Sequence, residues 1–148
     1  MNNKLTFNDI NNLIELLSDK VMNKYNPDIV VGIADGGIIP AILLAKKLNI
    51  EFIPIKISRD KAKSKKTEIR KWVSIPVDTY IKDKNILVLD DFSYSGYTLK
   101  MAKAGLLSLG ASDVKLAVLY HIWAFQGWKF KPDFAVEIGI KKLPEFPY

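Results

Sequence analysis

The chain has 148 residues, of which 49% are hydrophobic and 26% charged, with a formal net charge of +6 and no cysteine. These values are typical of a globular protein with a core of its own, and they predict one domain over residues 1–148. They exclude disulfides and thiolate metal sites. Because the sequence shows no bilayer-length apolar run and no signal-peptide core, we expect no membrane association and a cytoplasmic location.

The predicted secondary structure alternates helices with strands. In chain order, we expect a helix over 6–25, a strand over 29–34, a helix over 40–48, strands over 51–57, 72–76 and 85–91, a helix over 98–109 and a strand over 113–121. The helices repeat apolar residues at helical spacing, with Thr6 as an N-cap, and the strands are short apolar runs. The aromatic, proline-containing tail after 121 is expected to form a small irregular hood. This order predicts an α/β fold with a mostly parallel, twisted sheet flanked by helices.

The positive charge is concentrated in the basic segment, residues 56–71 (KISRDKAKSKKTEIRK), which holds eight Lys or Arg residues against two acids. We expect a flexible basic loop or hairpin there. Such a patch attracts a polyanion, either nucleic acid or a small phosphorylated ligand, although a solvated loop would have the same composition. Nucleic acid is the less favoured partner because the chain shows no motif that reads a nucleic-acid groove.

A hydrophobic strand followed by two acids and a hydroxyl-rich glycine turn stands out in ILVLDDFSYSGYTL, residues 86–99. The turn from Tyr94 to Thr98 lies between a strand and a helix, where backbone N–H groups converge on a phosphate. A phosphate cradle does not need acids, so Asp90 and Asp91 are candidates for sugar hydroxyls or Mg²⁺. A second glycine turn, IADGG, follows the strand at 29–34, and both turns are expected at the ligand-binding edge of the sheet.

These segments resemble the motifs of a known family. ILVLDDFSYSGYTL resembles the 5-phosphoribosyl-1-pyrophosphate (PRPP) signature of the type I phosphoribosyltransferases, and VVGIADGGIIPAILLAKKL resembles their pyrophosphate-loop segment. FKPDF and the closing FPY are similar to the tails of the short xanthine/guanine (hypoxanthine) members. The resemblance implies a homodimeric, Mg²⁺-dependent enzyme of purine salvage. It would transfer the phosphoribosyl group of PRPP to a nucleobase, expected to be a 6-oxopurine, and release pyrophosphate.

The resemblance also implies roles for individual residues. Asp90 and Asp91 would bind the ribose hydroxyls, act in catalysis and help to hold Mg²⁺. The 5′-phosphate would be held by Tyr94, Ser95, Gly96, Tyr97 and Thr98. Pyrophosphate would be contacted by Asp35, Gly36, Gly37, Lys56 and Arg59. The basic segment would close over the site as a mobile lid.

The nucleobase contacts are less well defined, with Tyr94, His121 and Tyr148 as candidates. The sequence favours a strand-end side chain for His121 over a base contact. It likewise favours core or dimer contacts over a stacking platform for Trp123, Trp128, Phe146 and Tyr148. Tyr94 stands where purine members usually carry an acid, and a tyrosine there is similar to the pyrimidine-operon regulators of this family. A regulatory module that senses PRPP or a nucleotide, with little transferase activity, is therefore the alternative function.

Overall fold

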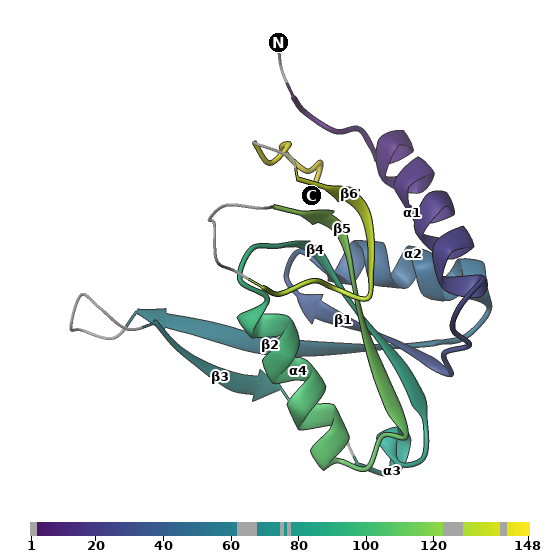
Figure 1. Ribbon diagram of the computed structural model, residues 1–148, viewed down its shortest axis with the longest axis vertical. Helices are drawn as coiled ribbons and strands as arrows, with labels where there is room; N and C mark the ends of the chain where they lie inside the picture. Colours follow the sequence, from purple (N-terminus) through teal and green to yellow (C-terminus); the bar gives the residue numbers. More distant parts are fainter. Residues whose placement is uncertain (1–2, 62–67, 75, 77, 123–128, 140–141) are drawn as a thin grey trace.

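The computed structural model describes residues 3–61, 68–74, 76, 78–122, 129–139 and 142–148. Its elements are α1 (Phe7–Met22), β1 (Ile29–Ala34), α2 (Ile38–Leu48), β2 (Glu51–Lys61), β3 (Glu68–Ser74), α3 (Asp78–Ile81), β4 (Asn85–Ser93), α4 (Tyr97–Ser108), β5 (Asp113–His121) and β6 (Phe134–Ile138). The strands form one sheet in the order β3-β2-β1-β4-β5-β6 (Figure 1). Among the described residues, β2 and β3 pair antiparallel, and the other four neighbouring pairs are parallel. The predicted α/β fold with a mostly parallel sheet is confirmed.

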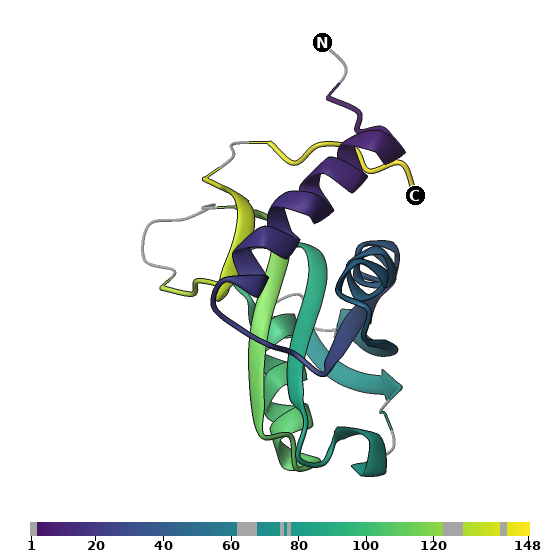
Figure 2. The same cartoon turned by 90° about the vertical axis from the view of Figure 1, so that its right-hand side faces the viewer.

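Helices cover both faces of the sheet (Figure 2). α1 and α2 pack together on one face, and α4 packs on the other, so each face has its own layer of core residues. The central strand β4 is apolar on both sides, because Ile86, Leu87, Val88 and Leu89 are fully buried. Burial on both faces is what makes a parallel strand read as a continuous apolar run. None of the helices in the described ranges is long and apolar enough to cross a membrane.

The first helix begins where the sequence predicts and ends three residues early. Thr6 and Asp9 form a capping box, in which Asp9 N–H donates to Thr6 Oγ1 (3.2 Å) and Thr6 N–H donates to Asp9 Oδ2 (2.7 Å). The apolar spacing continues to Tyr25, but the helix ends at Met22. Tyr25 instead turns toward the sheet, which explains why periodicity alone overestimated the helix length.

The sequence predicts an irregular hood after residue 121, but part of this tail is a regular strand. Residues 134–138 form β6, which pairs in parallel with β5 from Ala117↔Phe134 to His121↔Ile138. The strand is short and lies among prolines and aromatic residues, and those turn-forming residues hid its pattern. The predicted aromatic candidates Trp123 and Trp128 lie outside the described residues.

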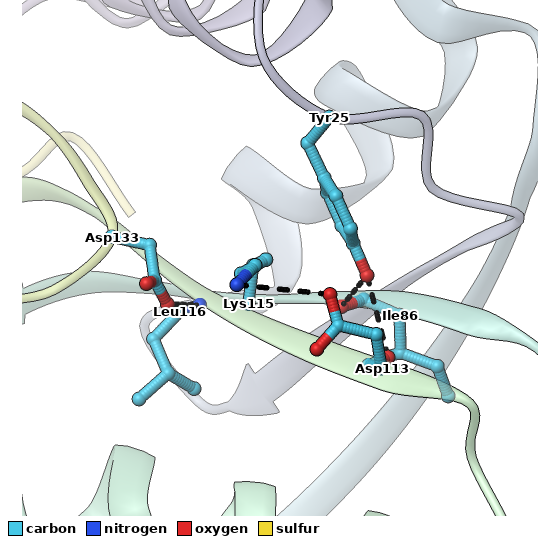
Figure 3. Close-up of polar contacts among 6 residues, drawn as sticks. All are labelled: Tyr25, Ile86, Asp113, Lys115, Leu116 and Asp133. Atoms are coloured by element: carbon cyan, nitrogen blue, oxygen red, sulfur yellow. Dashed lines mark hydrogen bonds and ion pairs between the residues drawn. The ribbon is translucent and has the colours of Figure 1, made fainter.

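The amino-terminal edge of the sheet is closed by polar contacts within the chain (Figure 3). The Tyr25 hydroxyl lies within hydrogen-bonding distance of the carbonyl oxygens of Ile86 (3.2 Å) and Asp113 (3.3 Å), at the starts of β4 and β5. Asp133 Oδ2 accepts a hydrogen bond from Leu116 N–H (2.7 Å). These contacts fix the end of the sheet that faces away from the two glycine turns.

Candidate active site

The carboxyl ends of β1 and β4, the middle of β2 and the first turn of α4 line an open cavity of about 500 Å³. Its polar lining combines residues from four separate segments of the chain: Asp35, Gly36, Lys56, Ser58, Asp90, Asp91 and Thr98. All of these except Ser58 are sequence-predicted site residues. The parallel sheet therefore brings both glycine turns and the start of the basic segment to one place, as expected for the carboxyl edge of an open α/β sheet.

The two acids lie inside β4, which continues to Ser93, and both are buried, with 9% of Asp90 and 7% of Asp91 exposed. Backbone hydrogen bonds orient them. Asp91 N–H donates to Asp90 Oδ1 (2.9 Å), and Phe92 N–H donates to Asp91 Oδ1 (2.8 Å). Two oriented, buried carboxylates can stabilise positive charge that develops on a bound molecule.

The glycine turn after β1 packs directly against this acid pair. A side chain at Gly36 would overlap the Asp91 carboxylate, so only glycine lets the turn approach this closely. The Ala34–Asp35 peptide bond in the same turn is cis. Gly37 does not line the cavity, and its N–H donates to the Ile33 carbonyl (2.8 Å), so its observed contacts are packing contacts beneath α2.

Lys56 and Asp35 form an ion pair at the mouth of the cavity, with 3.8 Å between Lys56 Nζ and Asp35 Oδ1. Half of the Lys56 side chain and 93% of the Asp35 side chain are exposed. An ion pair this exposed contributes little to stability, so the lysine can exchange this partner for an anion at small cost. The side chain of Arg59, the other predicted cation, lies outside the described part of the structure.

The turn after β4 leads into the N-terminus of α4. Gly96 is the N-cap residue with φ 72°, and as a glycine it offers no capping side chain to this helix. The first N–H groups of a helix have no intrahelical acceptors, so they are available to a ligand. Ser95 and Tyr97 contact each other locally through Tyr97 N–H and Ser95 Oγ (3.4 Å), while Tyr97 is mostly exposed.

Two buried hydroxyl groups at the cavity, Ser58 Oγ and Thr98 Oγ1, have no hydrogen-bond partner among the residues that the structure describes. A buried hydroxyl without a partner carries an uncompensated desolvation cost, so two such groups at one cavity indicate the place of a polar ligand. Sequence reasoning missed Ser58. Its signal is the position two residues after Lys56, which puts both side chains on one side of an extended strand.

The phosphoribosyl transferase domain family matches residues 4–138 of the chain. The chain belongs to this family. It is 30% identical to a purine phosphoribosyltransferase from Pyrococcus horikoshii Ot3, with a TM-score of 0.83 and coverage of 98% of this chain and 92% of that one. It is 25% identical to a hypothetical protein from Neisseria gonorrhoeae solved with bound ppGpp, with a TM-score of 0.84 over 97% of this chain and 86% of that one. An adenine phosphoribosyltransferase from Campylobacter hominis is 29% identical over 86% of this chain and 72% of the relative.

The family assignment confirms two predictions, the resemblance itself and the identification of the chain as an enzyme, a phosphoribosyltransferase. No finding favours the regulatory alternative.

Two of the three nucleobase candidates in this phosphoribosyltransferase lie near the acid cavity without lining it. Tyr94 is 37% exposed and meets Phe92 edge-on, with 5.3 Å between the ring centroids. Tyr148 stacks on Phe146 at 5.6 Å between centroids. Burial raises the pKa of the Tyr148 hydroxyl, and the nearby carboxylates of Asp91 and Asp90 raise it further, so this hydroxyl remains a hydrogen-bond donor.

The third candidate, His121, lies elsewhere. It is only 3% exposed, and its Nδ1 lies 2.8 Å from Ser93 Oγ. It lines a different cavity of about 430 Å³, together with Lys20, Lys24 and Lys131. Burial is the main influence that lowers the pKa of His121, which keeps the imidazole neutral. The phosphoribosyltransferase fold therefore gives His121 a buried partner and no place in the acid cavity.

Proposed function

We propose that this protein transfers the 5-phosphoribosyl group of PRPP to a purine base and releases pyrophosphate. The observation that carries the proposal is the composition of the acid cavity. Two oriented carboxylates, two buried hydroxyls without partners among the described residues, and the N-terminus of α4 meet there. A sugar that carries hydroxyls, a phosphate and a pyrophosphate satisfies all of these groups at once.

The 5′-phosphate is assigned to the turn from Tyr94 to Thr98. Thr98 Oγ1 gains the partner it lacks within the chain, and the first N–H groups of α4 donate to the phosphate oxygens. The helix dipole adds to this attraction at its N-terminus. This binding anchors one end of PRPP and so fixes the ribose beside β4.

Asp90 and Asp91 are assigned to the ribose. Their carboxylates accept hydrogen bonds from the 2′- and 3′-hydroxyls of the sugar. As pyrophosphate departs from C1, positive charge builds on the ring, and the two carboxylates stabilise it more strongly than they stabilise the ground state. Their contribution is therefore expected mainly in kcat.

Pyrophosphate is assigned to the part of the cavity formed by the Gly36 turn, Lys56 and Ser58. Lys56 exchanges its exposed partner Asp35 for the pyrophosphate charge, and Ser58 Oγ donates the hydrogen bond that it does not make within the described chain. Arg59 follows Ser58 in β2 and is kept as a proposed contact. We also retain the proposal that the basic segment closes over the site and excludes water, which would otherwise hydrolyse PRPP. The tip of the segment, residues 62–67, lies outside the described residues.

The residues fit a Mg²⁺ ion that enters with PRPP. Among the described residues, no group of three or more His, Cys, Asp or Glu side chains is arranged to hold a metal. Mg²⁺ commonly uses one or two carboxylates together with substrate phosphates and water, and Asp90 and Asp91 can supply the carboxylates. When bound, the ion would neutralise charge on the departing pyrophosphate.

For the acceptor we propose a 6-oxopurine, on the similarity of FKPDF and FPY to the tails of the xanthine/guanine-type members. The purine class is supported by the relative from Pyrococcus horikoshii. Adenine is the competing acceptor, because the Campylobacter hominis relative is an adenine phosphoribosyltransferase. Tyr94, which follows the acid pair in the chain, and Tyr148, whose hydroxyl pKa the acid pair raises, are the proposed base contacts.

Product analysis tests this proposal. The protein is incubated with PRPP and Mg²⁺, and with hypoxanthine, guanine, xanthine, adenine, uracil or no base, and nucleotides are separated by chromatography. We expect a purine nucleotide and pyrophosphate in equal amounts, with the largest rate for a 6-oxopurine. Asp91→Asn is the matched control for contaminating activity. Formation of only a pyrimidine nucleotide, or of none, would refute the proposal.

Three further properties are proposed on the family assignment alone: residues 1–148 act as one domain, the enzyme works in the cytoplasm, and it forms a homodimer. Light scattering at several protein concentrations measures the last of these.

A further inference from the structure

The phosphate-binding turn is contacted from outside by an aromatic ring that belongs to the segment after β5. The ring of Phe130 occupies the space into which a side chain at Gly96 would project. Gly96 is therefore glycine for two reasons: its positive φ of 72° and the presence of this ring. Lys100, one turn into α4, places its Nζ 5.3 Å from the centroid of the same ring.

Phe130 is in turn held by a buried polar pair. The His121 and Phe130 rings meet edge-on, with 5.9 Å between their centroids and 77° between their planes. The imidazole is also fixed by Ser93 Oγ, 2.8 Å from Nδ1. Ser93 is the last residue of β4, directly before the phosphate-binding turn. A closed chain of contacts thus runs from Ser93 through His121 and Phe130 to Gly96.

Resting on the proposed function, we infer that Phe130 braces the phosphate-binding turn and that His121 is a positioning residue that holds Phe130 in place. The turn must keep Gly96 at positive φ so that the N–H groups of α4 point at the phosphate. Gly96 itself has no side chain to cap α4, and the nearest side-chain bond is the long one from Tyr97 N–H to Ser95 Oγ (3.4 Å), so the contact with Phe130 helps to keep the turn in this shape before PRPP arrives. Preorganisation of this kind lowers the entropy cost of binding and appears in ligand affinity.

A positioning role for His121 differs from a nucleobase contact in the substrate that it affects. A base contact would change the choice of acceptor or its KM. A positioning residue that acts through Phe130 and Gly96 changes the affinity for PRPP and leaves the choice of acceptor unchanged. The two roles are therefore distinguishable by which substrate responds.

The experiment compares the full-length protein with its Phe130→Ala and Phe130→Leu variants, and PRPP affinity is measured by calorimetry in Mg²⁺ without an acceptor. We expect Phe130→Ala to raise the Kd for PRPP about tenfold, with Phe130→Leu between it and the unmodified protein. Phe134→Ala is the matched control, since Phe134 is a buried ring of β6 whose removal costs stability without baring Gly96. It should leave the Kd for PRPP unchanged.

His121 is tested by its polar bond to Ser93. His121→Leu should weaken PRPP binding in the same direction as Phe130→Ala, whereas His121→Asn, which keeps a polar atom near Nδ1, should restore most of the affinity. In steady-state assays the KM for PRPP should rise while the KM for the purine stays constant.

Equal PRPP affinities for Phe130→Ala and Phe134→Ala would overturn the brace, as would a change confined to the purine KM in the His121 variants. If the unmodified protein binds no PRPP, both the proposed function and the brace are wrong. If it binds PRPP and the Phe130 variants bind it equally well, only the brace is wrong.

Discussion

The two ends of the sheet differ in whether their polar atoms have hydrogen-bond partners within the described chain. At the amino-terminal edge, Tyr25 spans the carbonyls of Ile86 and Asp113, and Asp133 accepts from Leu116, so the chain supplies both partners (Figure 3). At the carboxyl-terminal edge, Ser58 and Thr98 hold buried hydroxyls that lack partners among the described residues. Within the described chain, these polar atoms therefore have hydrogen-bond partners at one end of the sheet, and the two hydroxyls lack them at the other.

The difference shows what distinguishes a binding edge from a structural one. Both ends contain buried oxygen atoms and carboxylates, so polarity alone does not separate them. At a structural edge, hydrogen bonds within the fold offset the desolvation cost of buried polar atoms. At a binding edge, hydrogen bonds to a ligand offset that cost. Substitutions at the carboxyl edge should therefore affect function, and substitutions at the amino edge should affect stability.

The largest effect is expected for the acids of β4. Asp90→Asn or Asp91→Asn removes a charge that meets positive charge in the transition state, so kcat should fall on the order of 100-fold or more. The unfolding temperature should change little, because asparagine keeps the size of the side chain and an oxygen acceptor. Steady-state kinetics and calorimetric melting measure the two quantities. A variant with near-normal kcat would remove that residue from its assigned role.

The partnerless hydroxyls should show a smaller functional effect. Thr98→Val replaces a hydroxyl by a methyl group of similar size, and Ser58→Ala removes the other, and each should weaken PRPP binding about tenfold. The free energy of unfolding should not decrease without ligand, since neither hydroxyl makes a bond within the described fold. Isothermal calorimetry and urea unfolding test this pair of expectations. A lower free energy of unfolding with unchanged PRPP affinity would show that these hydroxyls serve the fold and not ligand binding.

Tyr25→Phe is the matched change at the amino edge. It deletes one hydroxyl that reaches two backbone carbonyls, at 3.2 and 3.3 Å. We expect a loss of ~1 kcal/mol in the free energy of unfolding. Because the hydroxyl lies at the opposite end of the sheet, kcat and the KM for PRPP should be the same as in the unmodified enzyme. A lower kcat in this variant would show that the two edges are coupled.

The smallest effect concerns pH. Burial, with a further contribution from the Lys131 charge, lowers the pKa of folded His121 below the ordinary value of 6.5. The unfolded chain thus takes up a proton at a higher pH than the folded chain. Stability from His121 is complete above about pH 6.5 and decreases as the pH falls below it.

Unfolding temperatures measured from roughly pH 5 to 8 should decline less at the acid end for His121→Asn than for the unmodified protein. Parallel curves would show that His121 does not titrate differently in the fold.

The fold could be predicted from sequence wherever burial imposes a pattern. β1 and β5 have the predicted boundaries, because their apolar runs are ended by turn residues on both sides. α3 and β6 were missed, since four or five residues are too few to establish a period. The predicted hairpin partner of β2 was correct, although β2 runs on to Lys61 through residues whose charge suggested a loop.

The site could be predicted where the backbone itself encodes it. Asp90, Asp91 and Thr98 were found because strand, turn and helix follow one another directly in the chain. Ser58 was missed, because its place at the cavity depends on which neighbour fills a space between distant segments. Phe130 is 34 residues from Gly96 in sequence, and no local pattern reports that contact.

The strand order has a consequence for synthesis of the protein. β1 pairs with β2 on one side and with β4 on the other, so one of its edges stays bare until residues 85–93 have left the ribosome. An unpaired, fully apolar strand edge is a site for pairing with other chains. The nascent protein thus presents a bare apolar strand to other chains and to chaperones while its first half is complete and its central strand is not. The acid cavity forms only when that interval ends, because the strand that closes the edge of β1 also carries Asp90 and Asp91.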